Sequence, residues 1–148
     1  MKFKHMKQLI MTLMGYGICL TALAQTPLTY QEPVKQRVIV LTDITNEPDD
    51  QESLVRFLVY ANEYDIEGLV ATTSTHLRDK ARKDKIIELV NNYGKVKPNL
   101  DKHAVGYPTA EYLLSVTAAH LPLYSMEGVG AGKDSPGSEL IIKTADKA

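Results

Sequence analysis

The sequence is poor in cysteine and tryptophan. Its 148 residues include one cysteine and no tryptophan, and aromatic residues make up 7% of the chain. The single cysteine, Cys19, lies in an N-terminal segment that we expect to be cleaved, so the remaining chain has no thiol. A cysteine nucleophile, a thiolate metal site and a disulfide framework are therefore excluded there.

The chain also lacks a strong charge of either sign. Lysine and arginine number 17 against 18 aspartates and glutamates, which gives a net charge of −1. This balance provides no general electrostatic reason to bind nucleic acid or an anionic membrane, and we expect neither partner. Hydrophobic residues at 44% and charged residues at 24% are ordinary for a globular domain and argue against disorder.

The first 24 residues have the pattern of an export signal. Three lysines within the first seven residues precede an apolar stretch over 9–23, and Ala22-Leu23-Ala24 is an A-x-A cleavage pattern. The stretch is shorter than the roughly 20 residues that span a bilayer. An uncleaved anchor is the alternative, but we favour cleavage after Ala24 and a periplasmic or secreted protein that does not contact the membrane. Residues 25–36 follow as an extended, proline-bearing leader.

The rest of the chain alternates strand and helix patterns, which is typical of an α/β domain. Continuous apolar runs rich in β-branched residues predict strands over 37–42 and 66–73, both covered on two faces as in a parallel sheet. Apolar stripes of helical period and helix-starting residues predict helices over 49–62, 78–93, 108–120 and 138–147. A turn is expected at 98–100 and a flexible glycine loop at 128–132.

The number of predicted strands is too small for a complete sheet. Two parallel strands do not make a domain, and the region after residue 100 offers no further strand pattern. Either the last third contains strands that the pattern does not reveal, or the sequence is the N-terminal part of a longer domain. We favour the second explanation.

Most of the chemistry lies in the segment 43–50, Asp-Ile-Thr-Asn-Glu-Pro-Asp-Asp, which we call the acidic loop. It follows the first predicted strand, and ligands of open α/β sheets bind at the carboxyl ends of strands. Four carboxylates within eight residues suit Ca²⁺, which takes six to eight oxygen ligands. The alternative is a helix opening in which the acids only cap and complement the dipole. That alternative does not account for Asp43, which precedes the helix.

The acidic loop resembles the signature of the inosine-uridine nucleoside hydrolases, a strand followed by Asp-x-Asp-Pro-Gly-x-Asp-Asp. Asp43, Asp49 and Asp50 match its first, third and fourth aspartates, whereas Thr45 stands at the second. A narrower likeness is to the nucleoside-hydrolase-like domain of a bacterial exported family described as cellulose-binding. The segments that carry this narrower resemblance are 42–56, 67–74, His103, 107–113 and 135–138.

The resemblance implies a doubly wound, mostly parallel α/β domain over 37–148 with Ca²⁺ at its strand edge. It implies that Asp50 is the main metal ligand and that Asp43 is a second ligand that supports catalysis. Asp49 would bind a sugar hydroxyl. Thr45 cannot accept a proton at neutral pH, so the family's general base is missing at this position. Glu47 is our candidate for a replacement base.

Three further residues are expected to contact the ligand. Asn46 belongs to the acidic loop, and Thr75 lies where the family carries a ligand-binding Ala-Gly-Asn segment. His76 follows the second predicted strand and so faces the same edge, although a solvated loop histidine is the alternative.

Two functions remain open. The first is an exported, Ca²⁺-dependent hydrolase of N-glycosidic bonds in nucleosides or related sugar-bearing ligands. The second is a non-catalytic protein that binds carbohydrate, cellulose or a plant-wall glycan, on the same fold. Thr45 and Glu47 distinguish the two functions, because hydrolysis requires a general base that Thr45 cannot provide and Glu47 would have to supply. We lean toward the hydrolase and leave open an inert, truncated product, and the sequence permits a homo-oligomer without requiring one.

Overall fold

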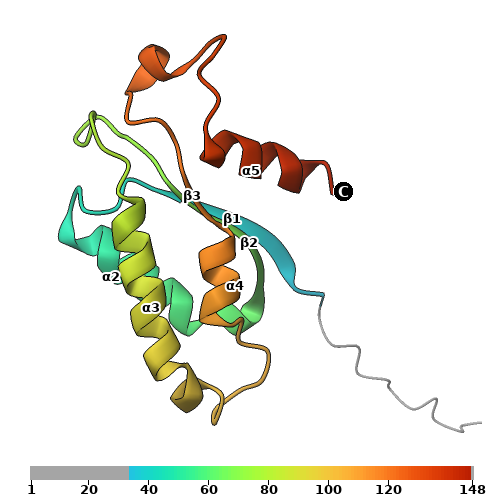
Figure 1. The fold of residues 1–148 in the computed structure, drawn as a ribbon. Coiled ribbons are helices and arrows are strands. Elements are labelled where there is room, and N and C mark those ends of the chain that lie inside the picture. Colours follow the sequence, from blue (N-terminus) through green and yellow to red (C-terminus); the bar gives the residue numbers. More distant parts are fainter. Residues whose placement is uncertain (1–33, 148) are drawn as a thin grey trace, which may run out of the picture. The chain divides into compact units, whose positions relative to one another are not determined.

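The structure is a computed structural model that describes residues 34–147 (Figure 1). The expected export signal lies outside the described residues, as does the leader up to residue 33. Within the described part of the chain, no helix is long and apolar enough to cross a membrane. The elements in chain order are β1 (Gln36–Thr42), α2 (Pro48–Val59), η1 (Ala61–Glu63), β2 (Tyr64–Ala71), α3 (Lys83–Leu100), α4 (Ala110–Ser115), β3 (Thr117–Ala119), η2 (Ser125–Gly128) and α5 (Pro136–Ala145).

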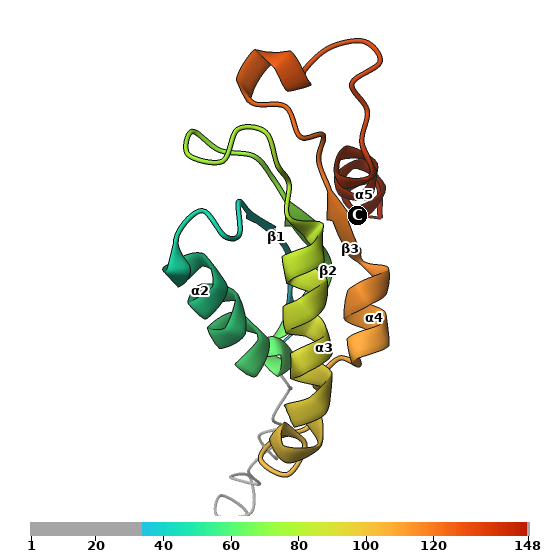
Figure 2. The same ribbon diagram turned by 60° about the vertical axis from the view of Figure 1, so that its left-hand side comes forward.

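Three parallel strands form one open sheet in the order β1-β2-β3. Helices α2, α3 and α4 pack against one face, and α5 lies along the other (Figures 1 and 2). The expected α/β class, with helices on both faces of a parallel sheet, is therefore confirmed. The predicted strands over 37–42 and 66–73 are present as β1 and β2, the latter two residues earlier at each end.

A β-bulge in β2 decides which side chains face which helices. Val38 pairs with Ile66 and Ile39 pairs with Gly68, so Glu67 is an extra residue without a partner on β1. Beyond it, Leu69 belongs to the core under α2 and α3. Glu67 instead contacts Arg37 of β1 and Lys147 just after α5. A buried carboxylate thus lies between the sheet and the end of α5.

The core lies between the sheet and helices α2, α3 and α4. Its fully or nearly fully buried members include Ile44, Leu54, Leu58, Ile66, Leu69, Ile86, Val90 and Leu113. Each such side chain contributes roughly 1.5–3 kcal/mol through its removal from water. Ile44 is 0% exposed although it belongs to the acidic loop, so one residue anchors that loop in the core.

The helix expected over 108–120 is present only as the short helix α4, and its second half is wrong. The helix α4 ends at Ser115, and the chain continues as β3, which pairs with Leu69–Ala71. Val116 ends α4 as its C-cap, and Thr117, which is β-branched and favours extended backbone, begins the strand that pairs with the central strand. The structure therefore contains a third strand that the sequence pattern did not reveal.

The expected helix over 78–93 is displaced, and the turn expected at 98–100 is wrong. Residues before Lys83 stay in the loop after β2, where Arg78 Nε donates to the Thr75 carbonyl at 2.8 Å. At the other end α3 continues through Gly94, where a Cβ would come within 2.9 Å of the Ala110 Cβ. Pro98 lies inside α3 near its C-terminal end, where it removes the single hydrogen bond that an N–H at this position would donate to the Gly94 carbonyl.

The bounds of α2 and α5 also differ from those expected, because each helix begins at a proline. Proline at the first position fits a helix, since the N–H it lacks would have no partner there. The helix α2 therefore starts at Pro48 and α5 at Pro136. The helix expected over 49–62 ends at Val59, and a separate 3-10 turn, η1, follows it.

Candidate functional site

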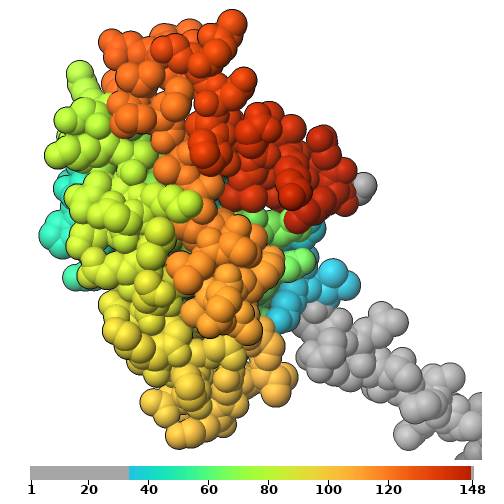
Figure 3. Space-filling view, viewed as in Figure 1, coloured from blue at the N-terminus to red at the C-terminus, as the bar shows by residue number. Residues whose placement is uncertain are grey.

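Three loops leave the carboxyl edge of the sheet next to one another. They are the acidic loop after β1, residues 72–82 after β2 and residues 120–135 after β3. Backbone pairing continues just past the strands, because Thr72 N donates to the Thr42 carbonyl at 2.8 Å and His120 N to the Ala71 carbonyl at 2.9 Å. Figure 3 shows the loop after β2 in contact with the segment that follows β3.

The acidic loop is a tight turn held by Ile44. Asn46 N donates to the Asp43 carbonyl at 3.1 Å, and Thr45 has a φ of 83°, in the left-handed region. Asp43 is half-buried, whereas Glu47 is exposed. The acidic loop therefore has a defined backbone, but its carboxylates do not share one enclosed space.

Asp50 caps the helix α2. Its carboxylate accepts a hydrogen bond from the Glu47 backbone N at 3.0 Å, and Asp50 N donates to the Glu47 carbonyl at 3.3 Å. Asp49 is exposed in the same first turn, where negative charge complements the helix dipole. The capping role considered for these acids is present for Asp50, and its role as a metal ligand stays a prediction.

The acidic side chains of the described residues are not gathered into a ready-made metal cluster, and a bound Ca²⁺ stays a prediction. Within residues 34–147, no three or more histidine, cysteine, aspartate or glutamate side chains are grouped so that they could hold a metal ion. Because Ca²⁺ takes six to eight oxygen ligands, an ion bound by Asp43 and Asp50 would need further ligands.

Thr45 is in a backbone conformation that β-branched residues rarely adopt. Thr45→Gly is expected to raise the free energy of unfolding by up to about 1 kcal/mol, since the relief of strain exceeds the added entropy of the unfolded chain. Thr45→Asn should give a smaller gain, because asparagine tolerates the left-handed region better than threonine. Chemical denaturation measures the free energy of unfolding of both variants. A loss of stability in Thr45→Gly would show that the backbone of Thr45 is not strained.

A hollow of about 190 Å³ opens between the loops after β2 and β3. We call it the inner hollow, and its lining residues are Thr72, Thr73, His120, Leu121, Leu123, Ser125, Gly128 and Lys133. The polar groups in this lining are hydroxyls, an imidazole and an ammonium, and the lining includes no carboxylate. It therefore offers several hydrogen-bond donors and acceptors but no acidic general base.

His120 is held in place by the start of α5. Its Nδ1 lies 3.2 Å from the Ser135 Oγ. Ser135 is 4% exposed and caps α5, because its Oγ accepts from Ser138 N at 3.1 Å. A histidine fixed through one ring nitrogen presents the other to a ligand in a defined direction.

The structure does not bring the predicted ligand-binding residues into this hollow. Thr75 Oγ1 lies 2.6 Å from the Tyr124 hydroxyl, away from the inner hollow. His76 is exposed, and its backbone N donates to the Ser74 Oγ at 3.2 Å. Asn46, Asp43, Asp49 and Glu47 do not line it either. Asp50 instead borders a separate hollow along β1, with Val40, Leu41, Thr42, Ser53, Leu54 and Phe57.

Sequence reasoning missed His120 because β3 was assigned to a helix. In a helix, His120 is only a residue near the C-terminus, whereas after a strand it lies at the ligand-binding edge. One signal in the sequence could have revealed it. The β-branched residues Val116 and Thr117 are followed by two alanines and then by His120.

Two comparisons with known proteins identify relatives of this chain. Residues 37–148 match a family model described as "Cellulose-binding Sde182, nucleoside hydrolase-like domain". A solved structure of a nucleoside hydrolase-related protein from Saccharophagus degradans, described as associated with carbohydrate metabolism, is 45% identical with a TM-score of 0.73. The match covers 76% of this chain and 28% of that one, so this chain spans less than a third of its length.

A search of curated proteins gave no match. The family match covers nearly all of the described residues, and the solved structure shares the fold at high identity. The resemblance found in the sequence is thereby confirmed. The chain belongs to the family described as the nucleoside hydrolase-like domain of cellulose-binding Sde182.

Proposed function

We propose that this chain contributes a carbohydrate-binding site at the carboxyl edge of its sheet, and that it binds the glycan without hydrolysing it. The observation that carries the proposal is the inner hollow, whose polar lining consists of hydroxyls, His120 and Lys133 without a carboxylate. Membership in a family described as cellulose-binding supports a carbohydrate as the ligand. Export through the N-terminal signal pattern fits this role, since plant-wall glycans lie outside the cell.

The polar groups of the inner hollow suit sugar hydroxyls, which both donate and accept hydrogen bonds. Thr73 Oγ1 donates to the Leu123 carbonyl at 2.9 Å, so its oxygen can still accept a hydrogen bond from a ligand. Lys133 supplies only donors, and His120 supplies the ring nitrogen that does not contact Ser135. Groups already held by the protein lose little freedom when a ligand binds, which favours affinity.

The acidic loop supports binding rather than hydrolysis. Thr45 has no group that accepts a proton at neutral pH, and Asp50 is engaged in capping α2. Glu47 is exposed at the start of that helix and does not line the inner hollow. A general base must come within hydrogen-bond reach of the water that it activates.

Ca²⁺-dependent hydrolysis of an N-glycosidic bond is the second candidate. It is favoured by membership in a nucleoside hydrolase-like family and by Asp43, Asp49 and Asp50 at the end of β1. In this alternative Glu47 serves as the base, and the ion requires oxygen ligands beyond those that the described residues bring together.

The two candidates are separated by one set of measurements on the full chain. Calorimetric titration with cello-oligosaccharides is expected to show binding, while chromatography with inosine, uridine and Ca²⁺ is expected to show no free base. His120→Ala should weaken glycan binding about tenfold, because its hydrogen bonds are lost. His103→Ala is the control, since His103 is exposed in the turn after α3. Release of base that Glu47→Gln abolishes would establish the hydrolase instead.

A further inference from the structure

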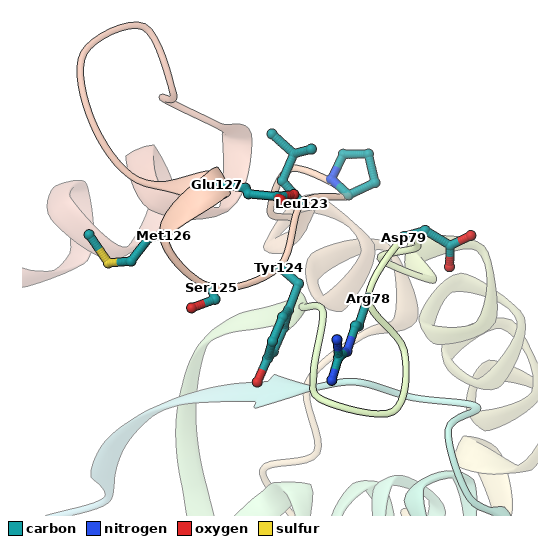
Figure 4. A pocket seen from close by; sticks show the side chains of 8 residues that line it. Arg78, Asp79, Leu123, Tyr124, Ser125, Met126 and Glu127 are labelled. Atoms are coloured by element: carbon teal, nitrogen blue, oxygen red, sulfur yellow. The ribbon is translucent and has the colours of Figure 1, made fainter.

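A second, larger hollow adjoins the inner one. It has a volume of about 520 Å³ and is lined by Arg78, Asp79, Pro122, Leu123, Tyr124, Ser125, Met126 and Glu127 (Figure 4). We call it the outer hollow. Leu123 and Ser125 line both hollows, so the two lie next to each other between the loops after β2 and β3.

Tyr124 and Arg78 form a fixed wall of the outer hollow. The Arg78 guanidinium lies over the Tyr124 ring, 5.0 Å from its centroid, and the two side chains lie side by side in Figure 4. Arg78 Nε donates to the Thr75 carbonyl at 2.8 Å, and the Tyr124 hydroxyl lies 2.6 Å from Thr75 Oγ1. Both side chains are thus held in position before a ligand arrives, which lowers the entropic cost of binding.

The lining combines apolar surface with charged groups. Pro122, Leu123 and Met126 supply the apolar part, and Met126 is 75% exposed. A sugar ring has an apolar C–H face and a rim of hydroxyls, so it can use both kinds of surface at once. Guanidinium donors and carboxylate acceptors suit hydroxyls that lie next to one another.

The charge of the outer hollow selects against anionic ligands. Asp79 and Glu127 contribute two negative charges and Arg78 one positive charge, which leaves the lining net negative. Like charges in one site disfavour each other, so a phosphate or a uronate pays an electrostatic penalty that an uncharged sugar does not.

Ser125 lies where the two hollows meet and has a φ of 56°, in the left-handed region. A residue other than glycine in this region costs free energy, and such residues cluster at binding sites. The strained position lies in the wall that the two hollows share, which agrees with one binding site rather than two unrelated depressions.

We propose that the outer hollow is a second sugar subsite, so that an uncharged oligosaccharide occupies both hollows and extends beyond the size of a single nucleoside. This inference rests on the proposed carbohydrate-binding function. It assigns Arg78, Tyr124 and Met126 to the recognition of a sugar unit distant from the one at His120.

Calorimetric titration of the full chain with cello-oligosaccharides of two to six units tests the proposal. Affinity is expected to rise with length until both hollows are filled. Tyr124→Ala should weaken binding of the longest oligosaccharide about tenfold and leave the shortest unchanged. Arg78→Lys keeps the charge but loses the planar stack, so it tests the same wall with less risk to folding. Arg82→Lys is the control, because Arg82 pairs with Asp84 outside the outer hollow.

Each outcome decides between the two proposals. Equal affinity for all lengths, or equal weakening of short and long oligosaccharides by Arg78→Lys, would overturn the second subsite and leave the carbohydrate-binding function intact. Tighter binding of oligogalacturonate than of cello-oligosaccharide of equal length would contradict the proposal that the ligand is an uncharged sugar. If the unmutated chain bound none of these probes, the carbohydrate-binding function itself would be wrong.

Discussion

Ile44→Ala is expected to lower the free energy of unfolding by about 2–5 kcal/mol. Ile44 is 0% exposed and packs in the core with residues of β2, α2 and α3. The substitution removes buried methyl groups and leaves a cavity, and both effects destabilise the folded state. The loss is large because the total stability of a domain is only about 5–15 kcal/mol.

The loss should also loosen the acidic loop. The turn that joins Asp43 and Asn46, and the left-handed Thr45 within it, are held to the core through Ile44. Hydrogen exchange is therefore expected to show faster opening of the Asn46 amide in the variant, because this backbone bond depends on the anchored turn.

Denaturant unfolding measures the change, with two graded controls. Ile44→Val removes one methylene and should cost about 0.5–1.5 kcal/mol. Val105→Ala changes a side chain that is 90% exposed and should stay within about 0.5 kcal/mol of the unmutated chain. A cost for Ile44→Ala no larger than that for Val105→Ala would mean that Ile44 does not anchor the acidic loop.

The first βαβ unit could be predicted from the sequence because its signals are local and agree with one another. Continuous β-branched apolar runs give β1 and β2, and Pro48 with two acids gives the start of α2. Ile44 and Glu67 could not be assigned in this way. Ile44 is a single apolar residue among polar neighbours, and Glu67 is buried only because a bulge adds one residue to β2.

The site was harder to predict because it depends on contacts between distant segments. The position of the acidic loop at the end of β1 followed from the strand pattern, but the direction of its carboxylates depends on the capping of α2. The two hollows join residues of 72–79 with residues of 120–133, which come together because β2 pairs with β3. A strand of three residues carries too short a pattern to be recognised from sequence alone.

Glu67→Gln is expected to lower the midpoint of thermal unfolding by several degrees at pH 7. Glu67 is 6% exposed and is bound by Arg37 and by Lys147, whose Nζ donates at 2.6 Å. Arg37 Nη2 also donates to the Thr144 carbonyl of α5 at 2.6 Å. Removing the carboxylate's charge weakens both ion pairs, and the loss is moderate because the Arg37 and Lys147 side chains are 41% and 52% exposed and stay partly solvated.

The same substitution should remove part of the dependence of stability on acid. Hydrogen bonds from Arg37 and then from Lys147 lower the pKa of Glu67 from 4.5 to about 2. Because the folded-state pKa lies below the unfolded-state value, this carboxylate stabilises the fold above about pH 4.5. That contribution disappears as the pH falls toward 2. The difference between the unmutated chain and Glu67→Gln should therefore shrink over this range.

Glu139→Gln provides the matched control, because Glu139 is exposed on α5 and forms no ion pair within residues 34–147. Its stability should follow that of the unmutated chain at every pH from 7 to 2. A constant difference in stability between Glu67→Gln and the unmutated chain over this range would show that the loss comes from packing alone.

The ion pairs join β1 and β2 to the C-terminal end of α5, whereas Ser135 at its N-terminal end holds His120. Weaker glycan binding by Glu67→Gln at temperatures where it stays folded would therefore show that α5 transmits this change to the site.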